Sequence, residues 1–144
     1  MSIKIAIGSD HAGFELKEKL IAYLKSIGAE VSDKGCYSSE RADYPDFGHA
    51  VAEAVLKEKD VIGILMCGSG NGIAMSANKH AGIRAALCWN EEICELARLH
   101  NDANILVLPA RYISEERAKK CLDIFLKTAF EGGRHQARVE KINL

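Results

Sequence analysis

One short segment combines a reactive side chain with a backbone suited to anions: Cys67-Gly68-Ser69-Gly70-Asn71-Gly72. Its alternating glycines let the chain approach a ligand closely and turn several N–H groups toward one point. An apolar run precedes the segment and a helical pattern follows it, which places a helix N-terminus beside the thiol. Such a cysteine should carry thiolate character near neutral pH and could act as a base or a nucleophile. The amides would stabilise an anion or a developing oxyanion, although a turn that only joins strand to helix is the simpler alternative.

Three familiar motifs do not fit this segment. A Walker A loop needs Gly-Lys-Ser/Thr where the chain has Gly72-Ile73-Ala74. The dinucleotide fingerprint needs a glycine at position 73, and a cysteine-dependent phosphatase loop needs an arginine there. Nucleotide binding and phosphate-ester hydrolysis through this loop are therefore disfavoured. A hydrolase that pairs Cys67 with His100 or His11 stays open, but no protease or transferase signature surrounds the cysteine.

Two histidines have polar neighbours that could orient an imidazole ring or a substrate hydroxyl. His11 follows Asp10 directly after the first apolar run, and His100 precedes Asn101 where a helical pattern ends. Each pair stands where a helix meets a loop, and we expect both on the ligand side of the protein. A histidine in such a loop is as often structural as functional.

Three arginines are candidates for binding an anion. Arg134 and Arg138 are one helical turn apart and project from the same face, a spacing suited to one phosphate group. A solvated basic face is an equally good interpretation of these two residues. Arg111 follows the last apolar run and should lie at the carboxyl end of a strand.

Short apolar runs alternate with amphipathic patterns along the chain and predict its secondary structure. The predicted strands are Ile3 to Gly8, Glu30 to Asp33, Val61 to Cys67, Arg84 to Cys88 and Asn104 to Leu108. The predicted helices span residues 13–27, 46–58, 72–79, 91–100 and 114–128. Such alternation implies a parallel sheet covered on both faces, hence an α/β fold with three layers and ligand sites beyond the carboxyl ends of the strands.

Length and composition indicate one compact domain spanning residues 1–144, with 48% hydrophobic and 27% charged residues. A net charge of −1 gives no general field that would gather nucleic acid or an anionic membrane. No apolar segment is long enough for a signal peptide or a membrane span. Five cysteines without a CxxC pair fit reduced thiols, so we expect a cytoplasmic protein.

The segment 131–144 differs from the rest of the chain. Gly132-Gly133 ends the preceding helix, and the charged stretch after it is too short to bury much apolar surface by itself. We expect this tail to dock on another surface, such as a partner subunit. No clustered set of His, Asp and Glu is visible in the sequence, so no metal is expected. The absence of a dinucleotide fingerprint means that no redox cofactor is expected either.

Eight segments, in order from the first strand to the tail, resemble the ribose-5-phosphate isomerase B family, which also includes subunits of galactose-6-phosphate isomerase. They are Gly8-Ser9-Asp10-His11-Ala12-Gly13, Asp33-Lys34-Gly35, Asp43-Tyr44-Pro45, Cys67-Gly68-Ser69-Gly70, Ala77-Asn78-Lys79, Gly82-Ile83-Arg84, His100-Asn101-Asp102 and Glu131-Gly132-Gly133-Arg134-His135. The resemblance implies a Rossmann-like three-layer α/β/α sandwich with a five-stranded parallel sheet and a C-terminal helical tail. It also implies homodimers or tetramers with active sites at the dimer interface.

By resemblance, Cys67 moves a proton between C2 and C1 of a sugar phosphate, and His100 assists opening of the furanose ring. The glycine loop would hold the enediolate oxygens, Asp10 and Asn101 the hydroxyls, and one histidine and three arginines the phosphate. The residues implied in substrate binding are Asp10, His11, Tyr44, Gly68, Ser69, Gly70, Asn71, Gly72, Asn101, Arg111, Arg134 and Arg138.

The sequence has Ser69 where threonine is frequent in the family and Asn71 where an apolar residue is frequent, and neither change removes a hydroxyl or an amide. Some members place a glutamate later in the loop as the base, but Ile73 cannot titrate, so the cysteine version is the consistent one. The expected reaction converts ribose 5-phosphate to ribulose 5-phosphate. A hexose 6-phosphate of the allose or galactose type and a non-catalytic binding module are the alternatives.

Overall fold

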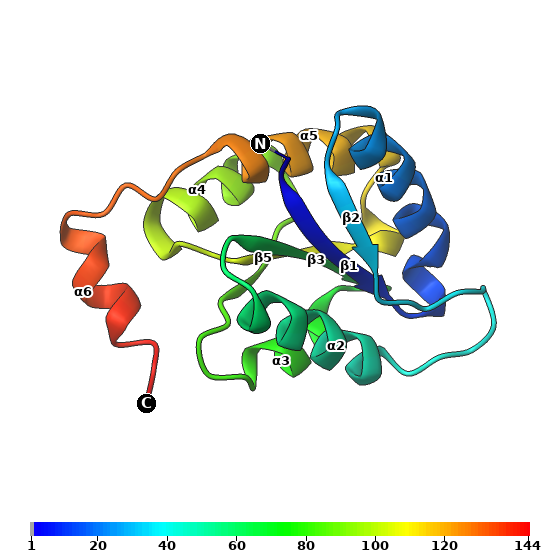
Figure 1. Ribbon diagram of the computed structural model, residues 1–144, viewed down its shortest axis with the longest axis horizontal. Coiled ribbons are helices and arrows are strands. Elements are labelled where there is room, and N and C mark those ends of the chain that lie inside the picture. Colours follow the sequence, from blue (N-terminus) through cyan, green and yellow to red (C-terminus); the bar gives the residue numbers. More distant parts are fainter. Residues whose placement is uncertain (1) are drawn as a thin grey trace.

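The protein, described over residues 2–144 by a computed structural model, is built on a parallel five-stranded sheet (Figure 1). The strands are β1 (Lys4–Ser9), β2 (Glu30–Asp33), β3 (Val61–Cys67), β4 (Ala85–Leu87) and β5 (Ile105–Pro109). Their order across the sheet is β2-β1-β3-β5-β4, and each neighbouring pair is parallel. The predicted fold class is confirmed. The sequence did not indicate that β5, the last strand, would lie between β3 and β4.

Helices follow the strands as the alternating pattern predicts. They are α1 (Phe14–Ser26), α2 (Tyr44–Lys57), α3 (Asn71–Asn78), α4 (Glu91–Asn101), α5 (Glu115–Lys127) and α6 (Arg134–Glu140), with short 3-10 turns at η1 (His11–Gly13) and η2 (Ala110–Tyr112). α2 begins two residues earlier than predicted. Pro45 lies in its first turn, where the fixed φ of proline suits a helix and its missing N–H costs nothing.

Two apolar cores lie on opposite faces of the sheet. α1, α4 and α5 cover one face, and α2 and α3 cover the other (Figure 1). Along β5, Leu106 and Leu108 pack into the first core, whereas Ile105 and Val107 pack into the second. Successive side chains of a strand point to opposite faces, so a strand covered on both sides must be apolar throughout. This explains the unbroken apolar runs in the sequence.

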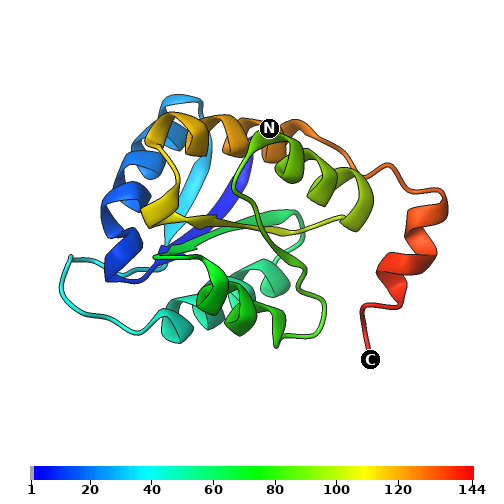
Figure 2. The same cartoon turned by 180° about the vertical axis from the view of Figure 1, so that it is seen from behind.

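The last helix, α6, stands away from the three layers, as the view from behind also shows (Figure 2). It lies near the end of α4, where the Glu131 N–H donates a hydrogen bond to the Leu99 carbonyl at 3.1 Å. His135 and Val139 are its buried residues. A seven-residue helix is unstable alone, so these few contacts leave most of its surface available to something outside the chain.

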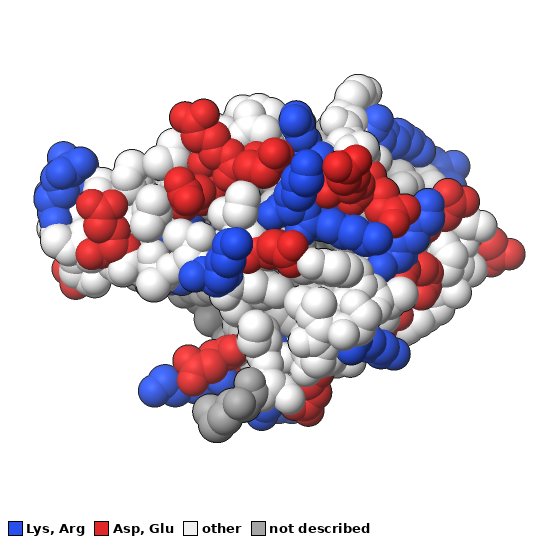
Figure 3. Space-filling view, turned by 90° about the horizontal axis from the view of Figure 1, so that it is seen from above, with Lys and Arg blue, Asp and Glu red and all other residues white. Residues whose placement is uncertain are grey.

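Charges of both signs are interleaved on the side of the molecule formed by α1 and α5 (Figure 3). Glu115, for example, forms ion pairs with Lys19 at 3.3 Å and with Lys119 at 2.9 Å. This face therefore presents no field of one sign. Within residues 2–144, no helix has both the length and the apolar character needed to cross a membrane.

Candidate active site

Cys67 ends β3 at the carboxyl edge of the sheet and is 4% exposed. Residues 68–70 connect it directly to α3, so the positive end of the helix dipole lies within one turn of the thiol. Such an environment favours an anion placed beside the loop. The predicted sequence of strand, glycine loop and helix is therefore present.

Two positions of this loop need glycine because neighbouring side chains lie too close for a Cβ atom. Gly70 has a φ of 82°, and a Cβ there would lie 2.4 Å from the Cδ1 atom of Leu87. A Cβ on Gly72 would lie 2.5 Å from ring atoms of Tyr44. The loop is thus packed too tightly for side chains at these positions. Tyr44, which the family resemblance implies in substrate binding, therefore lies beside the loop at Gly72.

Ser69 and Asn71 are exposed at the same rim. The Ser69 hydroxyl oxygen accepts hydrogen bonds from the backbone N–H and from the side-chain amide of Asn71, both at 3.3 Å. These two side chains hold each other in place across the loop.

Asp10 and His11 lie at the end of the neighbouring strand β1, which pairs with β3. One carboxylate oxygen of Asp10 accepts hydrogen bonds from the N–H groups of Ala12 and Gly13, at 3.0 and 3.2 Å. The Nδ1 atom of His11 lies 3.1 Å from the Ala42 carbonyl oxygen. Both side chains are therefore held by local contacts at the same edge of the sheet as Cys67.

Arg111 belongs to η2, which follows β5 at this edge. Its backbone N–H donates a hydrogen bond to the Gly68 carbonyl at 3.0 Å, and its Nη1 atom lies 3.2 Å from the Cβ position of Gly68. The guanidinium group thus lies over the start of the glycine loop. The predicted position of Arg111 at the carboxyl end of a strand is correct.

The expectation that His100 and Asn101 lie on this side is wrong. They end α4, and a helix that leaves the carboxyl edge returns the chain to the opposite edge before the next strand. The Gly63 N–H near the start of β3 donates to the Asn104 carbonyl at 2.9 Å, and Gly63 is four residues before Cys67. A strand rises about 3.3 Å per residue, so the end of α4, with His100 and Asn101, lies about 13 Å or more from Cys67.

Arg134 and Arg138 also lie away from Cys67, on α6 near the end of α4 (Figure 2). Both arginines are exposed, whereas His135 and Val139, at the same spacing, are buried. α6 therefore has one face on α4 and presents its arginines to solvent, as their spacing predicted. Within one chain, the predicted site residues form two separate groups at opposite edges of the sheet.

The amino-edge group contains an arrangement that the sequence analysis did not foresee. His100 and His135 stack with ring centroids 4.2 Å apart, and Glu131 lies next to both rings. Burial lowers the pKa of His135, and His100 and the neighbouring arginines lower it further. His100 is far from Glu131 and His135 in the sequence, so no cluster showed there, but folding brings the three residues together.

Lys17 and Asp33 are structural residues of the site that the sequence analysis missed. Lys17 is fully buried on α1, and its Nζ atom lies 2.9 Å from both carboxylate oxygens of Asp33. Asp33 also accepts from the Gly35 N–H at 2.9 Å, and the Gly35 carbonyl accepts from the Ser9 N–H at 2.7 Å. The ion pair therefore holds the loop after β2 against Ser9, the residue that precedes Asp10.

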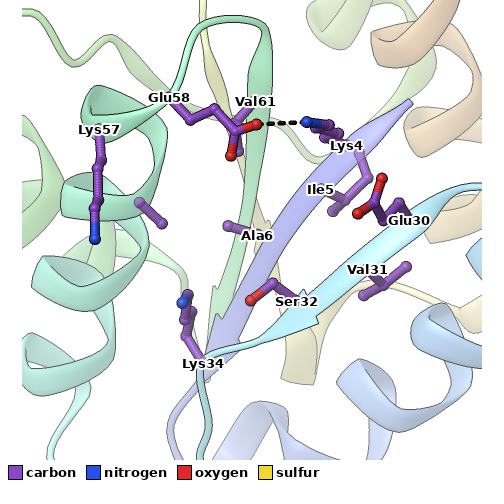
Figure 4. A pocket seen from close by; sticks show the side chains of 11 residues that line it. Lys4, Ile5, Ala6, Glu30, Val31, Ser32, Lys34, Lys57, Glu58 and Val61 are labelled. Atoms are coloured by element: carbon purple, nitrogen blue, oxygen red, sulfur yellow. Dashed lines mark hydrogen bonds and ion pairs between the residues drawn. The ribbon is translucent and has the colours of Figure 1, made fainter. Parts of the chain in front are cut away.

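A hollow of about 550 Å³ lies elsewhere, beside α2 over β1 and the edge strand β2 (Figure 4). Lysines and glutamates line much of it, and Lys4 and Glu58 form an ion pair across its end. It contains none of the predicted site residues and no cysteine or histidine. We therefore place the candidate active site at the carboxyl edge of β3 and not in this hollow.

The fold and the glycine loop define a Rossmann-like α/β protein, a class in which ligands bind at the carboxyl edge of the sheet. The chain belongs to the ribose/galactose isomerase family, whose model matches residues 5–142. It is 50% identical to ribose-5-phosphate isomerase B of Escherichia coli over 139 residues, 96% of this chain and 93% of the relative.

Solved structures that are similar to this chain belong to the same family. A ribose 5-phosphate isomerase of Thermotoga maritima is 52% identical, with a TM-score of 0.97 and 99% of each chain covered. Ribose-5-phosphate isomerase B of Mycoplasma genitalium with bound ribulose-5-phosphate is 44% identical, with a TM-score of 0.93, covering 99% of this chain and 95% of that one. The Rossmann-like fold and the family resemblance seen in the sequence are confirmed.

Proposed function

We propose that this protein interconverts ribose 5-phosphate and ribulose 5-phosphate, with Cys67 as the base. The observation that carries the proposal is the position of Cys67, at the end of β3 beside a tightly packed glycine loop and a helix N-terminus. A relative with bound ribulose-5-phosphate, 44% identical over nearly the whole chain, supports the choice of a pentose phosphate.

The chemistry follows from these groups. In the open-chain aldose, the thiolate of Cys67 takes the proton from C2, a C1–C2 double bond forms, and negative charge moves to the oxygen on C1. Amides of the Gly68 to Gly72 loop stabilise that charge, which is the main requirement of the step. The proton of the C2 hydroxyl passes to the oxygen on C1, the C2 carbonyl forms, and the thiol returns its proton to C1, which gives the ketose. Asp10 lies close enough to the loop to bind a substrate hydroxyl, and His11 and Arg111 supply hydrogen-bond donors for the phosphate.

Ring opening needs a second acid–base group, and His100 is too far from Cys67 to serve in the same chain. We infer that the protein is a homodimer in which His100, Asn101, Arg134 and Arg138 of one subunit complete the site that contains Cys67 of the other. The exposed arginines of α6 support this arrangement.

Exposed apolar side chains also support a dimer. Met75 on α3 is 67% exposed, Trp89 after β4 is 52% exposed, and Ile142 beyond α6 is 53% exposed. Large apolar groups of this kind often mark contacts between subunits. In this proposal the chain is a single domain whose segment 131–144 docks on the partner, and the five free thiols favour the cytoplasm as its compartment.

Incubation of the purified protein with ribose 5-phosphate should yield ribulose 5-phosphate, which a ketose assay detects. Allose 6-phosphate and galactose 6-phosphate, tested at the same concentrations, should react with a lower kcat/KM. No ketose from any of the three sugars would contradict the assignment as an isomerase, and preference for a hexose would contradict the proposed substrate.

Mixing two inactive variants tests the shared site. Cys67→Ala and His100→Asn, each alone, disable both sites of their homodimers. A mixed dimer regains one intact site, because the His100→Asn chain supplies Cys67 and the Cys67→Ala chain supplies His100. After the two variants are unfolded and refolded together in equal amounts, about one quarter of wild-type activity should return. If both groups acted within one chain, the mixture would regain nothing.

A further inference from the structure

Two stacked histidines, His100 at the end of α4 and His135 in α6, lie beside the carboxylate of Glu131. The Nε2 atom of His100 lies 3.8 Å from the Oε2 atom of Glu131, and the Nε2 atom of His135 lies 3.9 Å from the same oxygen. The three atoms all lie within 4.8 Å of one another. Both separations are too long for a hydrogen bond. Two imidazoles and one carboxylate thus lie close together without a hydrogen bond between either ring and the carboxylate.

The burial of His135 is the second observation that points to a ligand at this position. The residue is 5% exposed, and its Nε2 atom is buried without a hydrogen-bond partner. A buried polar atom of this kind costs about 1–3 kcal/mol unless something satisfies it. The Glu131 carboxylate and the ring of His100 are its polar neighbours in this cluster, so a cation bound among the three groups would satisfy the buried nitrogen.

We propose that His100, Glu131 and His135 form a binding site for one divalent transition-metal cation such as Zn²⁺. Two imidazoles and a carboxylate are a common protein ligand set for this ion, and an open fourth position is typical where only three protein ligands are present. His100 and Glu131 have side chains that are 38% and 50% exposed, so the ion can enter and keep a water.

The distances fit after adjustment of the two partly exposed side chains. Zinc bonds of about 2.0–2.1 Å place the ligand atoms of a tetrahedral site roughly 3.4 Å apart. The observed separations of 3.8 and 3.9 Å exceed this by a few tenths of an ångström. Glu131 belongs to the connection between α5 and α6, and its side chain is half-exposed. The lone pair of an imidazole nitrogen lies in the plane of the ring, so two stacked rings cannot both face one ion. Closure therefore requires the Glu131 carboxylate to shift and the partly exposed His100 ring to turn out of the stack, whereas the buried His135 stays in place.

Binding of the cation would link α4, the connecting segment and α6, which otherwise share few contacts. His100 ends α4, Glu131 lies in the connecting segment, and His135 is in the first turn of α6. The cation would fix α6 against α4. On the basis of the proposed function, it would also occupy the histidine needed for ring opening, so Zn²⁺ should inhibit turnover and a chelator should restore it.

Equilibrium dialysis of the metal-free protein against Zn²⁺ tests the site without reference to activity. The wild-type chain should bind one ion per subunit, and His135→Ala should abolish that binding. Because His135→Ala could also undock α6, Glu131→Gln is the second variant. It keeps the shape of the side chain and should weaken Zn²⁺ binding at least tenfold, since even outer-shell groups contribute that much.

The other histidine pair of the protein gives a matched control. His49 Nδ1 and His80 Nε2 lie 2.7 Å apart on a different part of the molecule, and among residues 2–144 they do not belong to a group of three possible metal ligands. His49→Ala should leave Zn²⁺ binding unchanged. The proposal is overturned if the wild-type protein binds no Zn²⁺, if Glu131→Gln and His135→Ala both bind it like the wild type, or if His49→Ala abolishes binding. Because dialysis measures only the ion, these results remain distinct from failure of the isomerase assay.

Discussion

Replacement of Cys67 by alanine is expected to reduce turnover of ribose 5-phosphate by roughly 10²- to 10⁴-fold, the usual contribution of a positioned proton-transfer group. Binding of the sugar phosphate should change little, because the glycine loop and Arg111 remain in place. The measurement is kcat in a ketose assay, together with the dissociation constant from calorimetry. Loss of turnover with retained affinity identifies a group that acts in the chemical step.

Two further cysteine variants make this prediction specific. Cys67→Ser keeps the size of the side chain but offers a much weaker acid, so it should be nearly as impaired as the alanine variant. Cys88→Ala removes another buried thiol, at the end of β4, and should keep nearly full activity. Near-normal turnover in Cys67→Ala would show that another group moves the proton.

Replacement of Asp33 by alanine should lower the free energy of unfolding by about 3–5 kcal/mol, because it leaves the buried ammonium group of Lys17 without its partner. Lys17 is fully buried, and both carboxylate oxygens of Asp33 contact it at 2.9 Å. Urea unfolding followed by circular dichroism measures the change. The loop that carries Gly35 should also lose order, since Asp33 accepts its N–H.

Glu18 is the matched control, because it is the other acidic neighbour of Lys17. Its carboxylate lies 3.4 Å from Nζ and is 48% exposed. Exposed pairs contribute about 1 kcal/mol or less, so Glu18→Ala should be nearly neutral. The double variant Lys17→Met with Asp33→Ala should recover much of the lost stability, because it removes the charge that was left buried. Equal destabilisation by Asp33→Ala and Glu18→Ala would contradict this account.

Much of the fold could be predicted because its signals are local. Apolar runs and helical periodicity located the five strands and helices α1 to α5 within two residues, and strict alternation indicated a parallel sheet. The carboxyl-edge group followed from the same reasoning, since Cys67, Asp10 and Arg111 all come directly after strands. The strand order was not predictable, because the position of β5 depends on packing between residues far apart in the chain.

The misplacement of His100 has a physical reason. A loop beside a helix can lie at either edge of the sheet, and only the direction of the chain decides which. Helices that follow strands begin at the carboxyl edge and end at the amino edge, so His100 had to lie opposite Cys67. Lys17 was missed because it is charged, yet it lies three residues after Phe14 and three before Leu20, on the buried stripe of α1. That spacing was visible in the sequence.

The strand order has a consequence for synthesis on the ribosome. β4 pairs only with β5, and β5 is the last strand to be made. A nascent chain that ends before Ile105 can therefore assemble only β2, β1 and β3, while Ala85–Leu87 waits without a neighbour. Insertion of β5 then fills the gap between β3 and β4 in a single event. Completion of the sheet is thus delayed until about three quarters of the polypeptide has left the ribosome.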